Sequence, residues 1–137
     1  MSQLRVDLVR SGETGSTAGI RGHALTFDRP DANGGNNTGP MGGEAFLAAI
    51  GGCFMSTLIA TAAAREVKIP DVACAVVGTF ADNPRRFESV NVTASSSTCE
   101  PEEFAHLVLL AGRGCLVLNT LRHMTATAVS VEAGGNG

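Results

Sequence analysis

The feature that most constrains the fold is a run of twenty residues without a charged side chain, AFLAAIGGCFMSTLIATAAA at 45–64. A helix of this length could span a bilayer. The composition argues against a membrane helix, because much of the run is Ala, Gly, Ser and Thr rather than the residues that lipid favours most. We therefore expect a helix over about 44–66 that is buried inside protein, with no membrane partner.

This expected helix is apolar on every side, which creates a burial problem. The chain has 137 residues, of which 44% are hydrophobic, and we interpret 1–137 as a single domain. A chain of this size offers limited cover for a helix that is apolar all round, and a second subunit would supply the rest. The packing argument alone therefore predicts a dimer.

Charge and composition bear on location and partners. The net charge is −3, no run of Lys or Arg is present, and Trp and Tyr are absent, so binding to nucleic acid has little support. The N-terminus, MSQLRVDLVRSG, has no continuous apolar segment typical of a signal peptide, which makes the cytoplasm the default location. Four cysteines are expected to be reduced there. No CxxC pair or cysteine–histidine spacing indicates zinc, and no motif indicates another cofactor.

The rest of the chain predicts an α+β fold with antiparallel sheets. Alternation of apolar and polar residues predicts strands over 3–9 and 124–132, and 19–27 is expected to form a mixed strand. The segments 72–81 and 87–95 flank the turn signal ADNPRR and are predicted to form a β-hairpin. Between them, 28–43 is a loop dense in turn-forming residues. A second helix opens at Pro101 with acidic residues in its first turn. Glycines at 112 and 114 are expected to break or kink it, and a short helix follows through Leu121.

The four cysteines fall in different surroundings. Cys53 lies in the middle of the charge-free run, directly after two glycines. Cys74 alternates with valines on one strand face and is predicted to lie in the core. Cys99 falls in the turn SSSTCEPEE and is predicted to be exposed. Cys115 continues the helical spacing of apolar residues in the second helix, and we expect it on the core face of that helix.

Three separated motifs resemble those of a known family. GPMGGEAFLAAIGGC at 39–53 is similar to GPxPxELLLxALGGC, GHALTFDRP at 22–30 to GHxxxxD, and CLVLNTL at 115–121 to CPVxNTL. These are motifs of the OsmC-like branch of the OsmC/Ohr family, the osmotically inducible and organic hydroperoxide resistance proteins. The resemblance covers about 5–132. It implies an OsmC-like fold, in which antiparallel sheets surround a long central helix that carries a cysteine, within an intertwined homodimer.

The resemblance also implies a thiol-dependent hydroperoxide reductase, with peroxiredoxin-like activity in oxidative stress. Carried over by position, Cys53 is the peroxidatic cysteine and Cys115 the resolving one. A thiolate attacks the peroxide and becomes a sulfenic acid, which a second thiol converts into a disulfide. The partners implied are a small hydroperoxide and an external dithiol reductant. The apolar neighbours Phe46, Phe54 and Met55 favour organic hydroperoxides.

Charged residues that could assist Cys53 are less clearly marked. In the organic hydroperoxide branch, the thiolate is held by an arginine from the N-terminal strands and by a glutamate ten residues before the cysteine. Here that position is Gly43, and Glu44 lies on the opposite side of an ideal helix from Cys53. Glu44 matches the ELLL glutamate, and its role is either that of thiolate partner or that of a favourable charge at the helix N-terminus. The candidate cations are Arg21 and His23, although a histidine on a strand can also be structural.

Two family prolines are missing. The residue after the second cysteine is Leu116, and the residue two before the glutamate is Gly42. Gly51 and Gly52, directly before the thiol, permit close packing or leave room for a peroxide. Two other functions stay open: a non-catalytic module that binds a small molecule or senses redox state, and a purely structural dimer.

Overall fold

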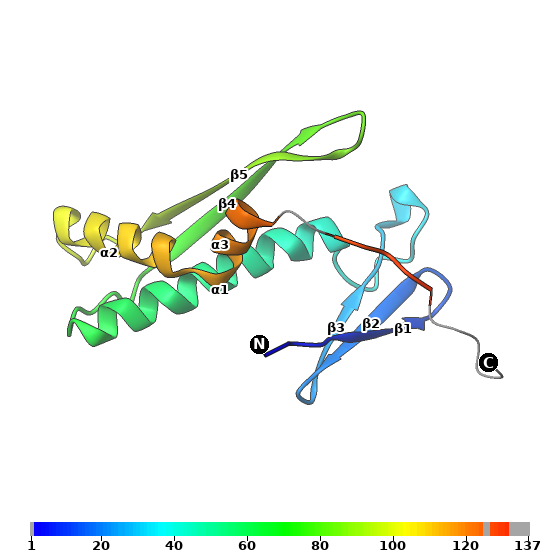
Figure 1. Cartoon of the computed structure of the whole chain (residues 1–137), viewed down its shortest axis with the longest axis horizontal. Helices are drawn as coiled ribbons and strands as arrows, with labels where there is room; N and C mark the ends of the chain where they lie inside the picture. The colour runs from blue at the N-terminus through cyan, green and yellow to red at the C-terminus, as the bar shows by residue number, and fades with distance from the viewer. Residues whose placement is uncertain (1, 125–126, 132–137) are drawn as a thin grey trace. The chain divides into compact units, whose positions relative to one another are not determined.

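The computed structural model describes residues 2–124 and 127–131 (Figure 1). Their strands and helices confirm the α+β class with antiparallel pairing. The described chain divides into two compact units. The first contains the residues up to Ala49 together with Val76–Val92, and the second contains Ile50–Ala75 and the residues from Thr93 onward. The elements in chain order are β1 Asp7–Ser11, β2 Gly15–Ile20, β3 His23–Phe27, the 3-10 turn η1 Asp31–Asn33, α1 Gly42–Ala64, β4 Ala73–Ala81, β5 Arg86–Ser95, α2 Pro101–Gly114 and α3 Leu116–His123.

The first unit begins with a three-stranded antiparallel sheet in the order β1-β2-β3. The prediction of one strand over 19–27 was wrong, because the chain reverses at Arg21 and Gly22. Both residues have positive φ, 50° and 84°, and Ile20 pairs directly with His23. Positive φ at both positions of a two-residue loop is the geometry of a type I′ hairpin. Arg21 is therefore a turn residue between two strands.

The loop after β3, predicted from its turn-forming residues, is held by the carboxylate of Asp28. This side chain is only 5% exposed. It accepts hydrogen bonds from the hydroxyls of Thr14 and Thr38, both at 2.7 Å, and from the backbone N–H groups of Arg29, Asn36 and Thr38. These donors, led by Thr38, hold the pKa of Asp28 well below its ordinary value. A buried carboxylate satisfied in this way fixes the loop that leads into α1.

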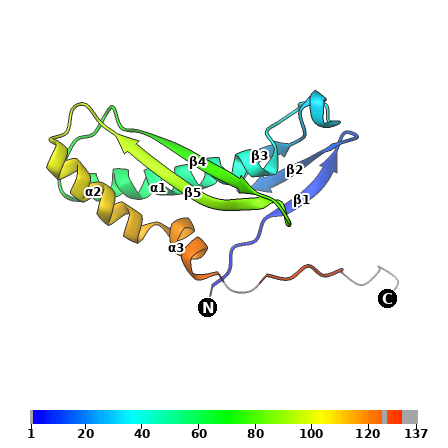
Figure 2. The same ribbon diagram turned by 90° about the horizontal axis from the view of Figure 1, so that it is seen from above.

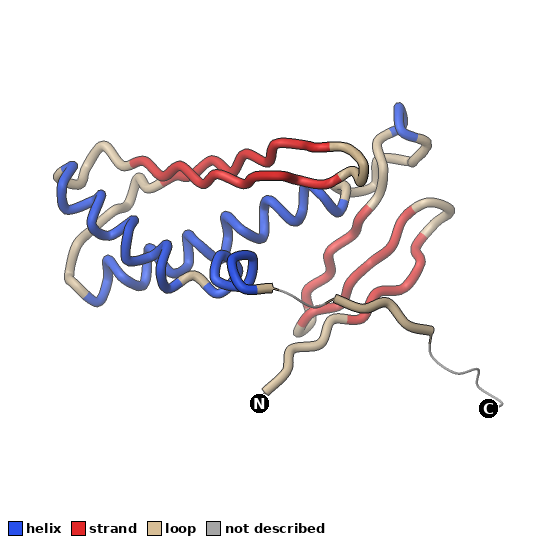
Figure 3. The backbone as a smooth tube through the Cα atoms, turned by 45° about the horizontal axis from the view of Figure 1, so that its top comes forward, coloured by secondary structure: helices blue, strands red, loops and turns tan. Residues whose placement is uncertain are grey.

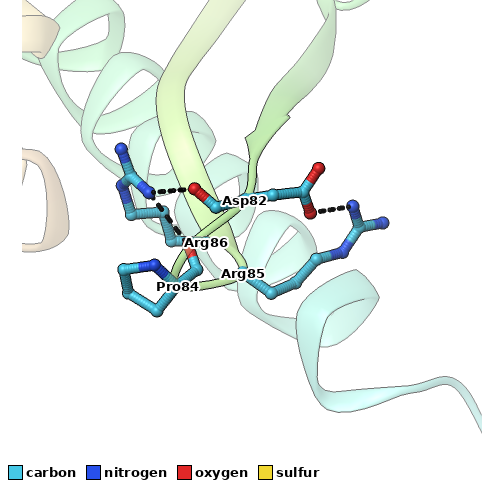
Figure 4. Close-up of polar contacts among 4 residues, drawn as sticks. All are labelled: Asp82, Pro84, Arg85 and Arg86. Carbon is cyan, nitrogen blue, oxygen red and sulfur yellow. Dashed lines mark hydrogen bonds and ion pairs between the residues drawn. The ribbon is translucent and has the colours of Figure 1, made fainter.

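The β4–β5 hairpin confirms the predicted pairing of these strands. Figure 4 shows its turn, where the Arg85 guanidinium donates to the Asp82 carboxylate at 3.0 Å and Arg86 donates to the carbonyl oxygens of Asp82 and Pro84. Such bonds satisfy backbone groups that leave the ladder at the turn.

Aromatic side chains connect this hairpin to the first turns of α1. The Phe87 ring stacks on Phe80, with centroids 4.8 Å apart, and on Phe46 of α1, with centroids 6.0 Å apart. A Cβ atom at Gly78 would lie 2.6 Å from the Phe87 ring, so only glycine leaves room for the ring there. The stack closes with Arg85, whose guanidinium lies 4.0 Å from the Phe80 centroid, an arrangement typical of a cation–π contact.

The long helix α1 confirms the predicted helix to within two residues at each end. Its buried side chains recur every four residues in the second unit, at Ile50, Phe54, Leu58 and Ala62. One such stripe buries one side of the helix only. Only 28% of the most apolar 18-residue window of α1 is buried inside this chain. Most of the apolar surface of α1 therefore remains uncovered.

Helix α2 runs beside the second half of α1 (Figures 1 and 2). Its start confirms the prediction: Pro101 occupies the first turn, and the Glu100 carboxylate accepts hydrogen bonds from the N–H groups of Glu102 and Glu103. Such a cap satisfies amides that have no partner within the helix. The buried face of α2 consists of Phe104, Leu107 and Ala111.

The prediction that Cys99 is exposed was wrong. Cys99 is 9% exposed, and burial raises the pKa of its thiol, assisted by the charges of Glu103, Glu100 and Asp71. The cause is a second anchored carboxylate. Asp71, in the connection between α1 and β4, accepts hydrogen bonds from the three hydroxyl residues of the SST turn, Ser96, Ser97 and Thr98. These bonds fold the turn inward and bury the residue that follows.

Cys74 alternates as predicted, but the prediction that it lies in the core was wrong, because the side chain is only half-buried in this chain. Val72, Cys74 and Val76 are all half-buried, whereas the residues between them are exposed. They therefore share one face of β4, although none of the three side chains is fully buried.

The predicted last strand is not formed in the part of 124–132 that is described. Met124 and residues 127–131 have no regular secondary structure, and 125–126 and 132 lie outside the described residues. Val129 and Val131 are fully exposed, at 101% and 95%. An alternating segment becomes a strand only when a neighbouring strand accepts its hydrogen bonds, and no described strand pairs with this one.

Candidate active site

Cys53 lies in the middle of α1, beside the buried stripe of that helix, and its side chain is partly exposed. The hydroxyl of Thr57, one turn later, donates to the Cys53 carbonyl oxygen at 3.0 Å. Gly51 is buried, whereas Gly52 is exposed. A Cβ atom at Gly52 would meet nothing within 4 Å in this chain. The structure therefore shows open space at Gly52, directly beside the partly exposed thiol.

Cys115 does not lie on a helix face as predicted, but between two helices. Helix α2 ends at Gly114, Cys115 has extended backbone angles of φ −76° and ψ 119°, and α3 begins at Leu116. The two helices meet at an angle of 57° (Figure 3). A Cβ atom at Gly114 would lie 3.4 Å from the Thr57 methyl group, so a glycine lets the junction approach α1 closely. The Cys115 side chain is fully buried.

The structure brings the two motif cysteines together. Cys53 is one of the groups that act on the pKa of the Cys115 thiol, and the methyl group of Thr57, one turn after Cys53, faces Gly114. The two thiols are therefore neighbours where the α2–α3 junction meets α1. Burial is the largest cause that raises the pKa of Cys115, and the neighbouring Cys53 raises it further. The N–H groups of Leu118 and Val117, in the first turn of α3, act in the opposite direction. The net pKa is raised, so Cys115 is a thiol rather than a thiolate at neutral pH.

Glu44 is engaged at the start of α1. Its Oε1 atom accepts a hydrogen bond of 2.9 Å from the N–H of Met41, whose own carbonyl accepts the N–H of Ala45. Met41 is thus the N-cap residue and Glu44 the third residue of the helix. A glutamate at this position that reaches back to the N-cap amide is one half of a capping box. The sequence left two roles open for Glu44, thiolate partner or favourable charge at the helix N-terminus, and this geometry matches the second.

The two candidate cations belong to the first unit. Arg21 lies in the β2–β3 turn and His23 begins β3, and both residues are exposed. Within 2–124 and 127–131, neither side chain forms a hydrogen bond or an ion pair. The thiols of Cys53 and Cys115 belong to the second unit.

No group of three or more His, Cys, Asp or Glu side chains that could hold a metal ion occurs among the described residues. Sequence reasoning assigned no role to two residues inside its own motifs. The aspartate of the GHxxxxD segment, Asp28, proves to be the anchor of its loop. Asn119 of CLVLNTL bonds the helix junction at Cys115. Only their positions within the family motifs could have indicated from the sequence that Asp28 and Asn119 have a role.

A long apolar helix that carries one cysteine, with a second, buried cysteine held against it between two further helices, defines an α+β protein built around a pair of thiols. The family model for OsmC-like proteins matches residues 34–130. The chain therefore belongs to the OsmC-like protein family. No curated protein matches the chain.

Solved structures share this fold over nearly the whole chain. An OsmC-like protein from Mycoplasma pneumoniae is 20% identical with a TM-score of 0.78, and the match covers 90% of this chain and 89% of that one. An organic hydroperoxide resistance protein from Legionella pneumophila is 19% identical with a TM-score of 0.66, covering 89% and 92%. The organic hydroperoxide resistance protein OhrB of Bacillus subtilis is 20% identical with a TM-score of 0.64, covering 88% and 93%. At these identities the likeness establishes the fold.

The family assignment also explains the one described helix that is long and apolar enough to cross a membrane, α1. In the OsmC-like fold this helix is a core helix. The prediction that the charge-free run is buried in protein rather than in lipid agrees with that placement.

Proposed function

We propose that this protein is a thiol-dependent hydroperoxide reductase, with Cys53 as the peroxidatic and Cys115 as the resolving cysteine. One observation supports the proposal above all others: the partly exposed Cys53 thiol lies beside the fully buried Cys115 thiol. In such a pair, a small molecule can reach the first sulfur, whereas the second sulfur is buried and can react mainly with the first. Organic hydroperoxide resistance proteins share the fold.

The proposed chemistry uses two sulfur atoms and an external dithiol. The Cys53 thiolate attacks the outer oxygen of the hydroperoxide and the O–O bond breaks, so that Cys53 becomes a sulfenic acid. The alkoxide that leaves takes a proton from water and departs as the alcohol. The Cys115 sulfur then attacks the Cys53 sulfur, a disulfide forms and water leaves. A dithiol finally reduces this disulfide to two thiols and is itself oxidised to a disulfide.

A thiolate at Cys53 calls for a neighbouring cation or hydrogen-bond donor, and we retain Arg21 and His23 as the candidates. Both are exposed and free of other described partners. The test is the rate of Cys53 alkylation against pH in a protein that keeps Cys53 as its only cysteine. A pH profile that stays unchanged in both Arg21→Ala and His23→Ala proteins would reject both candidates.

The function is tested by peroxide consumption with dithiothreitol as reductant, comparing cumene hydroperoxide with hydrogen peroxide. Cys53→Ser is expected to abolish turnover, and Cys74→Ser, a matched cysteine on β4, to leave it unchanged. The apolar side chains of α1 near the thiol predict faster consumption of the organic peroxide. Failure to consume either peroxide would reject the enzyme and favour the binding or sensing module. Glu44 gives that module some support, because its carboxylate is bonded to the helix N-terminus rather than to the thiol.

We also propose that the working form is a homodimer. The support is the uncovered surface of α1, of whose apolar window only 28% is buried, together with the exposed valines 129 and 131. Apolar surface of this extent is stabilised by association with a second copy. Light scattering should give about twice the chain mass of 14.0 kDa, and a stable monomer at micromolar concentration would refute the proposal.

A further inference from the structure

The junction that holds Cys115 has an unusual set of hydrogen bonds. The last carbonyl groups of a helix have no N–H partner within it, and α2 ends one residue before Cys115. Two of these carbonyl oxygens are bonded by side chains of α3. The Asn119 side-chain amide donates to the Arg113 oxygen at 2.9 Å, and the Arg122 guanidinium donates to the Gly112 oxygen at 3.1 Å.

Asn119 is the centre of this arrangement. Its side-chain oxygen accepts a second hydrogen bond from the Arg122 guanidinium at 3.1 Å, and its backbone N–H donates to the Cys115 carbonyl oxygen at 2.9 Å. One residue thus bonds the carbonyl of Cys115 and a carbonyl two residues before it. Together with Arg122 it ties the end of α2 to the first turns of α3 on both sides of the cysteine.

We propose that Asn119, supported by Arg122, is a positioning residue that holds Cys115 where its sulfur can form a disulfide with Cys53. The role as resolving cysteine rests on the proposed function. The geometric part does not, because any disulfide between these two residues needs the same placement.

The reason lies in the narrow geometry of a disulfide. Its Cα atoms must lie within about 4.4–6.8 Å of each other and its torsion angle is restricted. Cys53 is held in place because it lies in the middle of a long helix. Cys115, in contrast, is a single extended residue between two helices that meet at 57°. The backbone N–H of residue 119 would still bond the Cys115 oxygen in Asn119→Ala, but without the side-chain bond to the Arg113 oxygen Cys115 could shift together with α3. The effective concentration of its thiol at Cys53 would then fall, because a misplacement of about 1 Å can cost a hundredfold in an intramolecular reaction.

The first experiment measures the Cys53–Cys115 disulfide by equilibration with reduced and oxidised dithiothreitol, without any peroxide. Asn119→Ala is expected to lower the effective concentration of the pair about tenfold, which makes the reduction potential less negative by about 30 mV. The matched control is Thr120→Ala. The Thr120 hydroxyl donates only within α3, to the Leu116 oxygen at 2.8 Å, so its loss should leave the potential unchanged. Equal potentials in the Asn119→Ala and parent proteins, or an equal shift in Thr120→Ala, would overturn the proposal.

The second experiment follows the fate of the Cys53 sulfenic acid. In Asn119→Ala, a hydroperoxide should react with Cys53 at the parent rate. The slower disulfide step should then let more of the sulfenic acid proceed to sulfinic acid under excess peroxide, seen by mass spectrometry of the intact chain. Arg122→Ala should shift this partition in the same direction by less, and Arg122→Lys should partly restore it. A normal partition in Asn119→Ala, at an unchanged first step, would contradict the proposed role.

The two experiments separate this proposal from the function on which it rests. A protein that never reacts with peroxide but shows the shifted dithiothreitol equilibrium would reject the reductase and retain the positioning role. A fast peroxidase in which Asn119→Ala changes neither the disulfide equilibrium nor the fraction of sulfinic acid would retain the reductase and reject the positioning role.

Discussion

The fully buried thiol of Cys115 and the partly exposed thiol of Cys53 are neighbours, although Cys53 belongs to α1 and Cys115 to the α2–α3 junction. Their exposure is unequal: a small molecule can approach the Cys53 sulfur, whereas the Cys115 sulfur is shielded from solvent. In the proposed reaction this difference separates the peroxidatic from the resolving thiol. The consequences can be measured at residues on both sides of the pair.

The disulfide-forming step should be strongly pH-dependent. Burial raises the pKa of the Cys115 thiol above its ordinary value of 9.0, and the thiolate is the attacking species. The rate of disulfide formation from the Cys53 sulfenic acid should therefore increase with pH from 7 to 9 and continue to rise beyond it. Stopped-flow mixing with a stoichiometric hydroperoxide, followed by quenching and mass analysis, measures this rate. A plateau below pH 8 would show that Cys115 ionises more readily than its burial predicts.

Leu116→Pro should be neutral or stabilising, by up to about 1 kcal/mol. Leu116 is the first residue of α3, where proline is favoured because that N–H has no helical partner. Cys115 already has the extended backbone that the residue before a proline requires, and the Leu116 side chain is 66% exposed. Urea unfolding measures the change. Val117→Pro is the control, and it should destabilise the protein, because it removes an N–H that acts on the Cys115 thiol.

Glu44→Ala should lower the free energy of unfolding by about 0.3–1 kcal/mol, the contribution of a favourable charge at a helix N-terminus. Glu44→Gln should retain the part of the stability that comes from the hydrogen bond, because the glutamine side-chain oxygen can also accept from the Met41 amide. In both variants the reaction of Cys53 with hydroperoxide should stay within about twofold of the parent rate, as expected for a residue that acts on the helix end. A large fall in that rate with unchanged stability would instead identify Glu44 as a partner of the thiolate.

Asp71→Asn should lower the melting temperature at neutral pH and matter less in acid. Hydrogen bonds from Thr98, Ser96 and Ser97 hold the pKa of Asp71 well below its ordinary value of 3.8. A lowered folded pKa stabilises the folded state above the unfolded pKa, and this contribution is lost as the pH falls through the folded value. The difference in melting temperature between parent and Asp71→Asn should thus be largest near pH 7 and shrink below about pH 4.

The control for this prediction is Asp82→Asn. Asp82 forms an ion pair with Arg85 in which its side chain is 71% exposed, and exposed pairs contribute little to stability. Its removal should leave both the melting temperature and its acid dependence almost unchanged. If the difference between parent and Asp71→Asn instead stays constant down to pH 2, the Asp71 carboxylate does not anchor the SST turn as described.

The elements that could be predicted from the sequence are those encoded locally. The charge-free run predicted α1 because its length and composition are those of a helix that is apolar on every side, and the turn ADNPRR predicted the β4–β5 hairpin. The family motifs pointed to Cys53 and Cys115 as a pair, which the geometry of the second unit now shows as neighbours.

The elements that were predicted wrongly depend on partners distant in sequence or on rare backbone angles. Arg21 adopts positive φ, which side chains other than glycine seldom do, so the β2–β3 turn resembled a continuous strand. Cys99 is buried because Asp71, from a different connection, binds the residues before it. The alternation at 127–131 predicts a strand only where a neighbouring strand is available, and alternation carries no information on that neighbour.

The most direct test of the account is the identity of the disulfide that one equivalent of hydroperoxide produces. Peptide mapping of the parent protein should show a Cys53–Cys115 cross-link within one chain. Cys53→Ser should leave Cys115 reduced, and Cys115→Ser should leave Cys53 as sulfenic or sulfinic acid. Oxidation that goes instead to Cys74 or Cys99, or a Cys115 that oxidises equally fast without Cys53, would contradict the assignment of the two thiols.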